Sequence, residues 1–146
     1  MKVKQKINIL DNNLNIVFFD GYCGLCNWLV NFLLKKDKKK KLHFASRQSE
    51  FARIFLKTST SLSEIDAVIY LKSGKVYTKS SAILWILSQL DGIWKLSMIL
   101  FLIPAFLRNI IYDWIAKKRY LWFGEKDTCY LPQSEFNDRF YYHVEK

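Results

Sequence analysis

Short apolar runs alternate with helical patterns along the first two thirds of the chain. Apolar runs bounded by turn residues predict strands, and apolar positions three and four residues apart predict helices. In chain order they predict strand, helix, strand, helix, strand, strand and helix, over residues 15–20, 24–36, 42–45, 49–56, 67–71, 76–78 and about 80–90. The last two strands flank a Gly-containing turn, which is typical of a hairpin. The first two are joined through a helix and are expected to be parallel.

This order predicts an α/β, thioredoxin-like core over residues 15–91, with a four-stranded mixed sheet flanked by helices. Ser80 or Ser81 is expected to cap the helix that follows the hairpin. Residues 92–132 predict a helical C-terminal extension, with one helix over 93–103 and a second from Pro104 to about residue 118. A polar tail is expected over 133–146. The length of 146 residues fits one domain.

The first strand leads directly into two cysteines, Cys23 and Cys26, at the start of a helix. Two residues three apart in a helix lie on one face, so their sulfur atoms can meet. The helix N-terminus favours thiolate over thiol. A strand that feeds Cys-x-x-Cys into a helix is typical of a thioredoxin-like redox site.

Half of a zinc site and an incidental pair are the alternatives for these cysteines. Structural zinc normally needs four ligands. Cys129 and two histidines are the remaining sulfur and imidazole donors, and none shows paired spacing. We therefore assign no metal and expect no cofactor.

The predicted topology brings further polar residues to the edge of the sheet where the cysteines lie. Arg47 follows the second strand, Asp66 precedes the third, and Lys79 follows the fourth. Arg47 or Lys79 would lower the pKa of Cys23, whereas ionised Asp66 would oppose that shift. The alternative for Arg47 is a solvated charge or an ion-pair partner.

Four more residues are expected beside the cysteines. Asp20 and Gly21 form the turn before Cys23, and Asp20 lies close enough to influence its proton. Ser80 and Ser81, together with Arg47, predict an anion pocket suited to a carboxylate such as that of glutathione. Helix capping is the alternative role for the two serines.

Cys129 allows two interpretations. In the first it is a buried, small apolar residue of the C-terminal segment. In the second, residues 124–132 fold back over the active edge, so that Cys129 becomes a third redox thiol or a metal ligand. Its polar, turn-like surroundings are the reason to consider the second interpretation beside the first, and a disulfide would need Cα atoms within about 7 Å.

Charge and hydropathy narrow the choice of partner. The formal net charge is +10, much of it in the lysine run over residues 35–41, which is interpreted as a solvated loop. No recognised motif accompanies this run, so nucleic acid is not an expected partner. The apolar run over 96–107 has about 12 residues and is too short to span a bilayer, but peripheral contact with a membrane remains an alternative.

The odd, low cysteine count and the polar N-terminal stretch predict a cytoplasmic protein with reduced thiols.

Several separated motifs, in this order, resemble the thiol-disulfide oxidoreductase DCC family. They lie at 19–26, 44–49, 74–82, 112–120, 122–124 and 127–132, within a similarity that runs from about residue 15 to residue 132. The resemblance implies a thioredoxin-like fold and a dithiol–disulfide role. Ordinary thioredoxins carry a cis-proline before the third strand, whereas the stretch over 63–67 has no proline. Docking of an extended substrate is therefore expected to differ from theirs.

The sequence thus predicts a thiol–disulfide oxidoreductase. Cys23 is expected to attack the substrate and Cys26 to resolve the mixed disulfide. Cys23 is expected to be the more reactive and the less buried thiol. A disulfide or dithiol, on a protein or a glutathione-like molecule, is the expected substrate. The sequence specifies neither the direction of exchange nor an oligomeric state. The alternative is a non-catalytic redox-sensing or metal-binding module that docks on an anionic or membrane partner.

Overall fold

Four strands form one mixed sheet in the order β2-β1-β3-β4, in a computed structural model that describes residues 15–57, 62, 67–125, 127 and 134–140. The strands are β1 (Asn15–Phe19), β2 (Leu42–Ser46), β3 (Ile69–Lys72) and β4 (Lys75–Thr78). β1 pairs parallel with β2 and antiparallel with β3, and β3 pairs antiparallel with β4. The predicted thioredoxin-like topology is confirmed.

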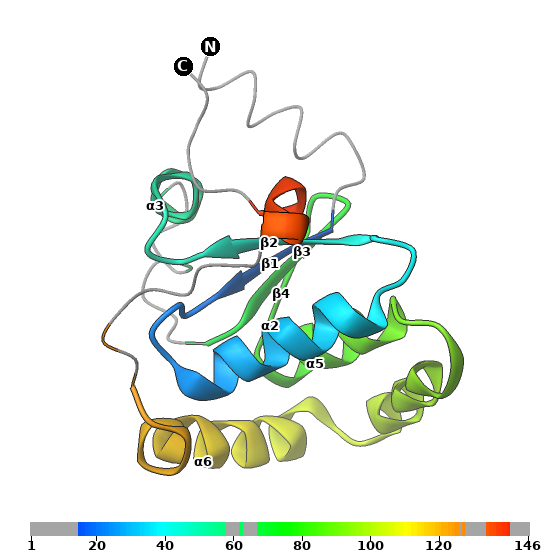
Figure 1. Cartoon of the computed structure of the whole chain (residues 1–146). Helices are drawn as coiled ribbons and strands as arrows, with labels where there is room; N and C mark the ends of the chain where they lie inside the picture. Colours follow the sequence, from blue (N-terminus) through cyan, green and yellow to red (C-terminus); the bar gives the residue numbers. More distant parts are fainter. Residues whose placement is uncertain (1–14, 58–61, 63–66, 126, 128–133, 141–146) are drawn as a thin grey trace.

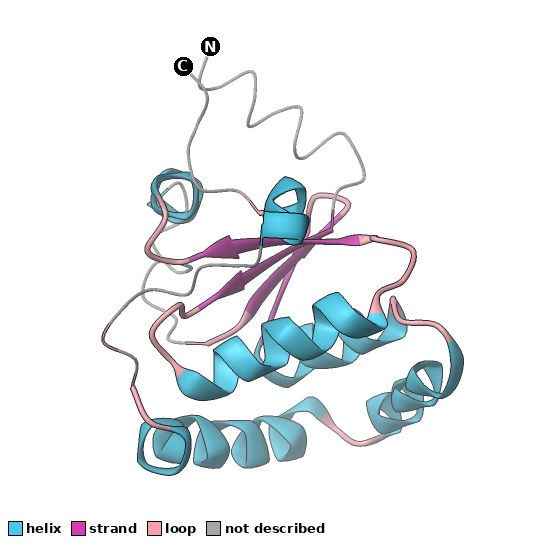
Figure 2. Cartoon of the chain, in the orientation of Figure 1, coloured by secondary structure: helices cyan, strands magenta, loops and turns pink. Residues whose placement is uncertain are grey.

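Helices cover both faces of the sheet (Figures 1 and 2). Alternate residues of β1 point to opposite faces, as the pleat of a strand requires. Val17 and Phe19 pack in the core beneath α2 (Gly24–Lys36) and α5 (Lys79–Ser88). Ile16 and Phe18 pack against α3 (Glu50–Lys57) on the other face. β1 is buried on both sides, which explains its continuous apolar run.

The C-terminal extension adds a further layer, on the far side of α2 and α5 from the sheet (Figure 1). It consists of η1 (Gly92–Leu102), which is a 3-10 helix, and α6 (Ala105–Phe123). The helix opened by Pro104 continues to Phe123, five residues past its predicted end, and a glycine in the left-handed region follows it. No described helix alone is long and apolar enough to cross a membrane; η1 and α6 together pass that test but meet at a bend of 116°.

The predicted capping of α5 by Ser80 or Ser81 is wrong. α5 begins at Lys79, and Thr78 at the end of β4 is its N-cap. The chain turns from strand to helix with no intervening loop, because Lys79 adopts a left-handed φ of 54°. Ser80 and Ser81 therefore lie inside the first turn of the helix.

Residues 134–140, within the predicted polar tail, pack against β2. η2 (Ser134–Arg139) ends in a buried ion pair between Arg139 and Asp37, with 2.5 Å between nitrogen and oxygen. Arg139 Nε also donates to the carbonyl oxygen of Leu42 at 3.1 Å. Phe140 stacks on Phe44 with 5.4 Å between ring centroids. This segment therefore completes the edge of the core at β2.

Candidate active site

Cys23 and Cys26 occupy the first turn of α2, directly after the strand that carries them to the edge of the sheet. Cys23 is the N-cap residue, and its carbonyl oxygen accepts the first helical hydrogen bond, from Asn27 N–H at 3.0 Å. Both cysteines are free thiols and both are buried. The helix N-terminus therefore points at a dithiol, as predicted.

The two thiols have very different proton affinities. Hydrogen bonding from the Cys26 thiol lowers the pKa of Cys23 to about 6, and it outweighs the opposing effect of burial. The backbone N–H groups of Cys26 and Leu25 and the guanidinium of Arg119 lower this pKa further. The same hydrogen bond to Cys23, followed by burial, raises the pKa of Cys26 well above its ordinary value. At neutral pH the pair is therefore a thiolate at Cys23 and a thiol at Cys26.

Asp20 holds the turn that precedes Cys23. Its Oδ1 accepts hydrogen bonds from Tyr22 N–H and from Gln48 Nε2, both at 3.0 Å. Gln48 Oε1 in turn accepts from Gly21 N–H at 3.0 Å. The side chain of Asn27 donates to the Gly21 carbonyl at 3.1 Å. The turn is thus fixed by Gln48, which follows β2, and by Asn27 of α2.

The last part of α6 supplies the remaining partners of Asp20. Tyr120 donates a hydrogen bond to Asp20 Oδ2, and Arg119 lies 3.8 Å from the same oxygen. Burial raises the pKa of Asp20, but the hydrogen bonds from Tyr120, Tyr22 and Gln48, with the charge of Arg119, lower it overall. Asp20 is therefore an ionised carboxylate that positions Arg119 beside the dithiol.

A short segment after α6 covers Cys23. The N–H of Gly24 donates to the carbonyl oxygen of Gly124 at 3.1 Å, and Cys23 pairs with Glu125 in an antiparallel bridge. A Cβ atom at Gly24 would lie 2.2 Å from the carbonyl oxygen of Phe123, so only glycine fits there. We call Phe123–Glu125 the strap.

The burial of Cys23 beneath the strap contradicts the prediction that Cys23 is the less buried thiol. Cys23 is 0% exposed and Cys26 is 5% exposed, so Cys23 is not the less buried thiol. The prediction considered only the turn that follows Cys23 in α2. It missed backbone that arrives from a distant part of the chain. Cys23 is therefore closed to solvent while the strap lies over it.

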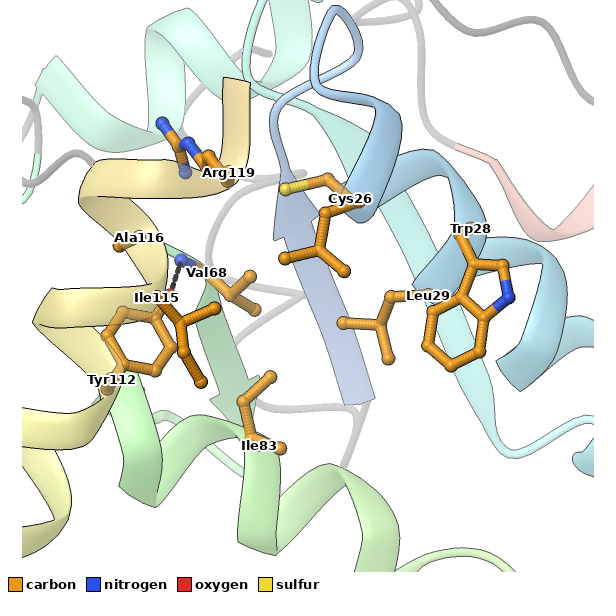
Figure 3. Close-up of a pocket in the computed structure, with 10 residues that line it drawn as sticks. Cys26, Trp28, Leu29, Val68, Ile83, Tyr112, Ile115, Ala116 and Arg119 are labelled. Carbon is orange, nitrogen blue, oxygen red and sulfur yellow. Dashed lines mark hydrogen bonds between the residues drawn. The ribbon is translucent and has the colours of Figure 1, made fainter. Parts of the chain in front are cut away.

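A cavity of about 250 Å³ lies between α2 and α6 and reaches Cys26 (Figure 3). Its walls are mainly apolar and come from α2, α5, α6 and Val68, the residue before β3. The lining residues are Leu25, Cys26, Trp28, Leu29, Val68, Ile83, Tyr112, Ile115, Ala116 and Arg119. The cavity offers an apolar group a place next to the cysteine pair.

Three other predicted site residues, Lys79, Ser80 and Arg47, make contacts that the structure describes. Lys79 forms an ion pair with Asp113 of α6 at 3.1 Å, and Ser80 Oγ donates to Asn109 Oδ1 at 2.5 Å. The backbone N–H of Arg47 donates to the carbonyl of Phe19, at the same edge of the sheet as the cysteines. The charge of Arg119 is among the causes that lower the pKa of Cys23, and the predicted contributions of Arg47 and Lys79 stay predictions.

The remaining predictions for the site are not tested. Asp66 and Cys129 lie outside the described residues. Ser81 is half-buried in the first turn of α5, and the anion pocket that it would form with Ser80 and Arg47 stays a prediction. Within the described ranges, no three His, Cys, Asp or Glu side chains gather in a way that could hold a metal ion.

Arg119 and Tyr120 are the site residues that sequence reasoning missed. A polar stripe along an apolar helix could have identified them. Polar residues recur at helical spacing ahead of Arg119, at Asn109, Tyr112 and Asp113. Such a stripe on an otherwise apolar helix indicates the side that faces a polar partner.

The sequence is similar to those of known proteins. The family model for DCC1-like thiol-disulfide oxidoreductase matches residues 17–125. The uncharacterized protein YuxK of Bacillus subtilis (strain 168) is 39% identical over 126 residues, which are 86% of this chain and 92% of that protein. A chloroplastic DCC family protein of Arabidopsis thaliana is 33% identical over 118 residues, 80% of this chain and 69% of that protein. No solved structure matches the chain.

Proposed function

Because the chain belongs to the DCC1-like thiol-disulfide oxidoreductase family, we propose that it catalyses thiol–disulfide exchange through Cys23 and Cys26. One observation carries the proposal: Cys23 caps the N-terminus of α2 and has a pKa of about 6, so it is mostly thiolate at neutral pH. The thiolate is the nucleophile in this chemistry. Cys26, one turn further on, keeps its proton and is ready to resolve the intermediate.

The first step consumes the thiolate. Cys23 Sγ attacks one sulfur of a substrate disulfide, forms a mixed disulfide and releases the other sulfur as a thiolate. The negative charge leaves Cys23 with the departing group. The hydrogen bond and the charge that raise the pKa of Cys26 are then lost, so its thiol becomes more acidic. The released thiolate takes up the Cys26 proton.

The second step resolves the intermediate. Cys26 Sγ attacks Cys23 Sγ, the Cys23–Cys26 disulfide forms, and the second substrate thiolate leaves and is protonated by solvent. The substrate disulfide gains two electrons and becomes two thiols, and the protein dithiol loses two electrons. A reducing thiol returns the protein to its starting state, and the reverse sequence oxidises a dithiol.

An apolar substrate fits the surroundings of the cysteine pair better than a charged one. The cavity beside Cys26 has mainly apolar walls, and a group bonded to the sulfur that Cys23 attacks could occupy it. We propose a disulfide flanked by an aromatic or aliphatic group, on a protein or a small molecule, ahead of glutathione disulfide. Reaction also requires the strap to leave Cys23. A cytoplasmic location stays a proposal.

Turnover with two disulfides tests this function. The reduced protein is assayed with an aromatic disulfide and with glutathione disulfide, in the presence of a reducing thiol that regenerates it. We expect turnover with the aromatic disulfide, faster than with glutathione disulfide, and its loss in Cys23→Ser. Cys129→Ser is the matched control and should retain the rate.

Two results would contradict the proposal. Equal activity of Cys23→Ser and the unmodified chain would remove Cys23 from the mechanism. No turnover with either disulfide, despite a reduced dithiol, would favour the non-catalytic redox-sensing or metal-binding module instead.

A further inference from the structure

The helix α6 is amphipathic in the opposite sense to a helix that packs on a core. The side that faces the domain carries the polar contacts of the helix, beside Ile115 and Ala116, which line the cavity. Asn109 accepts from Ser80, Tyr112 Oη accepts from Val68 N–H at 3.0 Å, and Asp113 pairs with Lys79. The side that faces outward is apolar, with Phe106, Ile110, Ile111, Trp114, Leu121 and Trp122 all exposed. A helix of a water-soluble domain normally has the reverse arrangement.

The 3-10 helix η1 extends this apolar surface. None of its residues is buried. Ile93, Leu96, Ile99 and Leu102 are all exposed, and Leu102 is 84% exposed. We call the outward side chains of η1 and α6 the apolar face. Many exposed apolar side chains on two successive elements indicate an interaction site.

Cations are interspersed with the apolar residues. From Gly92 to Phe123 the basic residues are Lys95, Arg108, Lys117, Lys118 and Arg119, and the acidic residue is Asp113. Lys118 Nζ lies 4.9 Å from the ring centroid of Trp114 and 5.6 Å from that of Trp122. Lysine side chains that extend over tryptophan rings are typical of the boundary between headgroups and acyl chains of a bilayer.

The lysine run joins the same surface. Lys39 forms an ion pair at 3.4 Å with Asp91, the residue that precedes η1, and Lys95 lies 3.8 Å from the same carboxylate. Lys39 of this run therefore lies beside the start of the apolar face. Clusters of four to eight basic residues beside an amphipathic helix are attracted to anionic lipid headgroups.

The bonds between α6 and the core indicate whether this helix would lie on a membrane or cross it. The polar side of α6 is bonded to α5 and to the residue before β3, so the helix cannot leave the domain to span a bilayer without losing those bonds. The bend of 116° between η1 and α6 also prevents a straight span. Amphipathic helices that stay attached to their domain bind a bilayer by lying in its interface instead.

We propose that the apolar face docks this protein on the surface of an anionic lipid bilayer. Its apolar side chains enter the boundary of the acyl chains, while Lys95, Lys117, Lys118 and the lysine run contact the headgroups. The same cations oppose a second copy of the chain as the occupant, since two positive surfaces would meet. The inference goes beyond thiol–disulfide exchange and does not depend on it.

Co-sedimentation of the full chain with lipid vesicles tests the proposal. The vesicles are phosphatidylcholine alone, and phosphatidylcholine with phosphatidylglycerol. We expect binding to the vesicles that contain phosphatidylglycerol, weakened by added salt. The double variant Leu102→Asp/Leu121→Asp should bind at least about tenfold more weakly, because two apolar anchors become charged. Val76→Asp, at an exposed apolar site on β4, should bind as the unmodified chain does.

A second measurement does not depend on those variants. Brominated lipids in the anionic vesicles should quench the tryptophan fluorescence, and Trp114→Phe/Trp122→Phe should lose most of that quenching. Absence of binding to anionic vesicles would overturn the proposal. So would equal binding of the double aspartate variant, or a dimer of the chain that this variant dissociates and that shows no affinity for vesicles.

Discussion

The hydrogen bond from Cys26 to Cys23 can be removed without removing the nucleophile. Cys26→Ala deletes the donor, and Cys26→Ser keeps a donor of similar size in the same place. Burial and the helix terminus act equally in both variants. A comparison of the two variants therefore isolates the largest contribution to the low pKa of Cys23.

The expected change in the pKa of Cys23 can be worked out from how far that pKa lies below its ordinary value. The pKa of Cys23 falls from 9.0 to about 6, which corresponds to about 4 kcal/mol in favour of the thiolate. A hydrogen bond to a charged group contributes about 1.5–3 kcal/mol, or roughly one to two pKa units. We expect the pKa of Cys23 to rise to between about 7 and 8 in Cys26→Ala and to stay near 6 in Cys26→Ser.

Thiolate absorbance in the ultraviolet, followed against pH, measures this pKa without requiring a reagent to pass the strap. Cys129→Ser is included in every protein so that this thiol does not contribute. A Cys26→Ala protein whose Cys23 still titrates near 6 would refute the hydrogen bond as the cause. Equal values for the alanine and serine variants would refute it as well.

Three further predictions concern the strap, the edge of the core and pH. Gly24→Ala should displace the strap, because its Cβ atom would meet the Phe123 carbonyl at 2.2 Å; alkylation of Cys23 should then be several-fold faster at a matched thiolate fraction, and an unchanged rate would show that the strap does not limit access. Arg139→Ala should cost about 3–5 kcal/mol in urea unfolding, because it leaves the buried Asp37 without its partner; a cost below about 1 kcal/mol would show that this pair contributes little. The free energy of unfolding of the reduced protein should rise by up to about 3 kcal/mol from about pH 6 to pH 8, and this gain should be lost as the pH falls through 6. Between about pH 6 and pH 8, Cys23 is deprotonated in the folded state and protonated in the unfolded state. The unfolding of Cys23→Ser should lack this pH dependence.

The sheet and the cysteine pair were predictable because local pattern specifies them. The apolar run of β1 and the spacing of Cys23 and Cys26 each lie within a few neighbouring residues. The mixed topology follows from connection lengths, since a helix joins β1 to β2 and a tight turn joins β3 to β4.

The surroundings of the dithiol were less predictable because the distant C-terminal extension supplies them. Tyr120 meets Asp20 across a separation of 100 residues, and the strap reaches Cys23 from the end of α6. Neither contact follows from spacing within the core. The burial of Cys23 and the charge of Arg119 beside it were therefore missed. The capping of α5 was missed because backbone φ at Lys79 replaces the loop that a serine cap would require.

The most direct test of the proposed chemistry is the mass of a trapped intermediate. Cys26→Ser lacks the resolving thiol, so incubation with an aromatic disulfide should give one stable adduct. Peptide mapping should locate that adduct on Cys23, and Cys23→Ser should form none under the same conditions. An adduct on Cys129, or equal adducts in both variants, would contradict the assignment of Cys23 as the attacking thiolate.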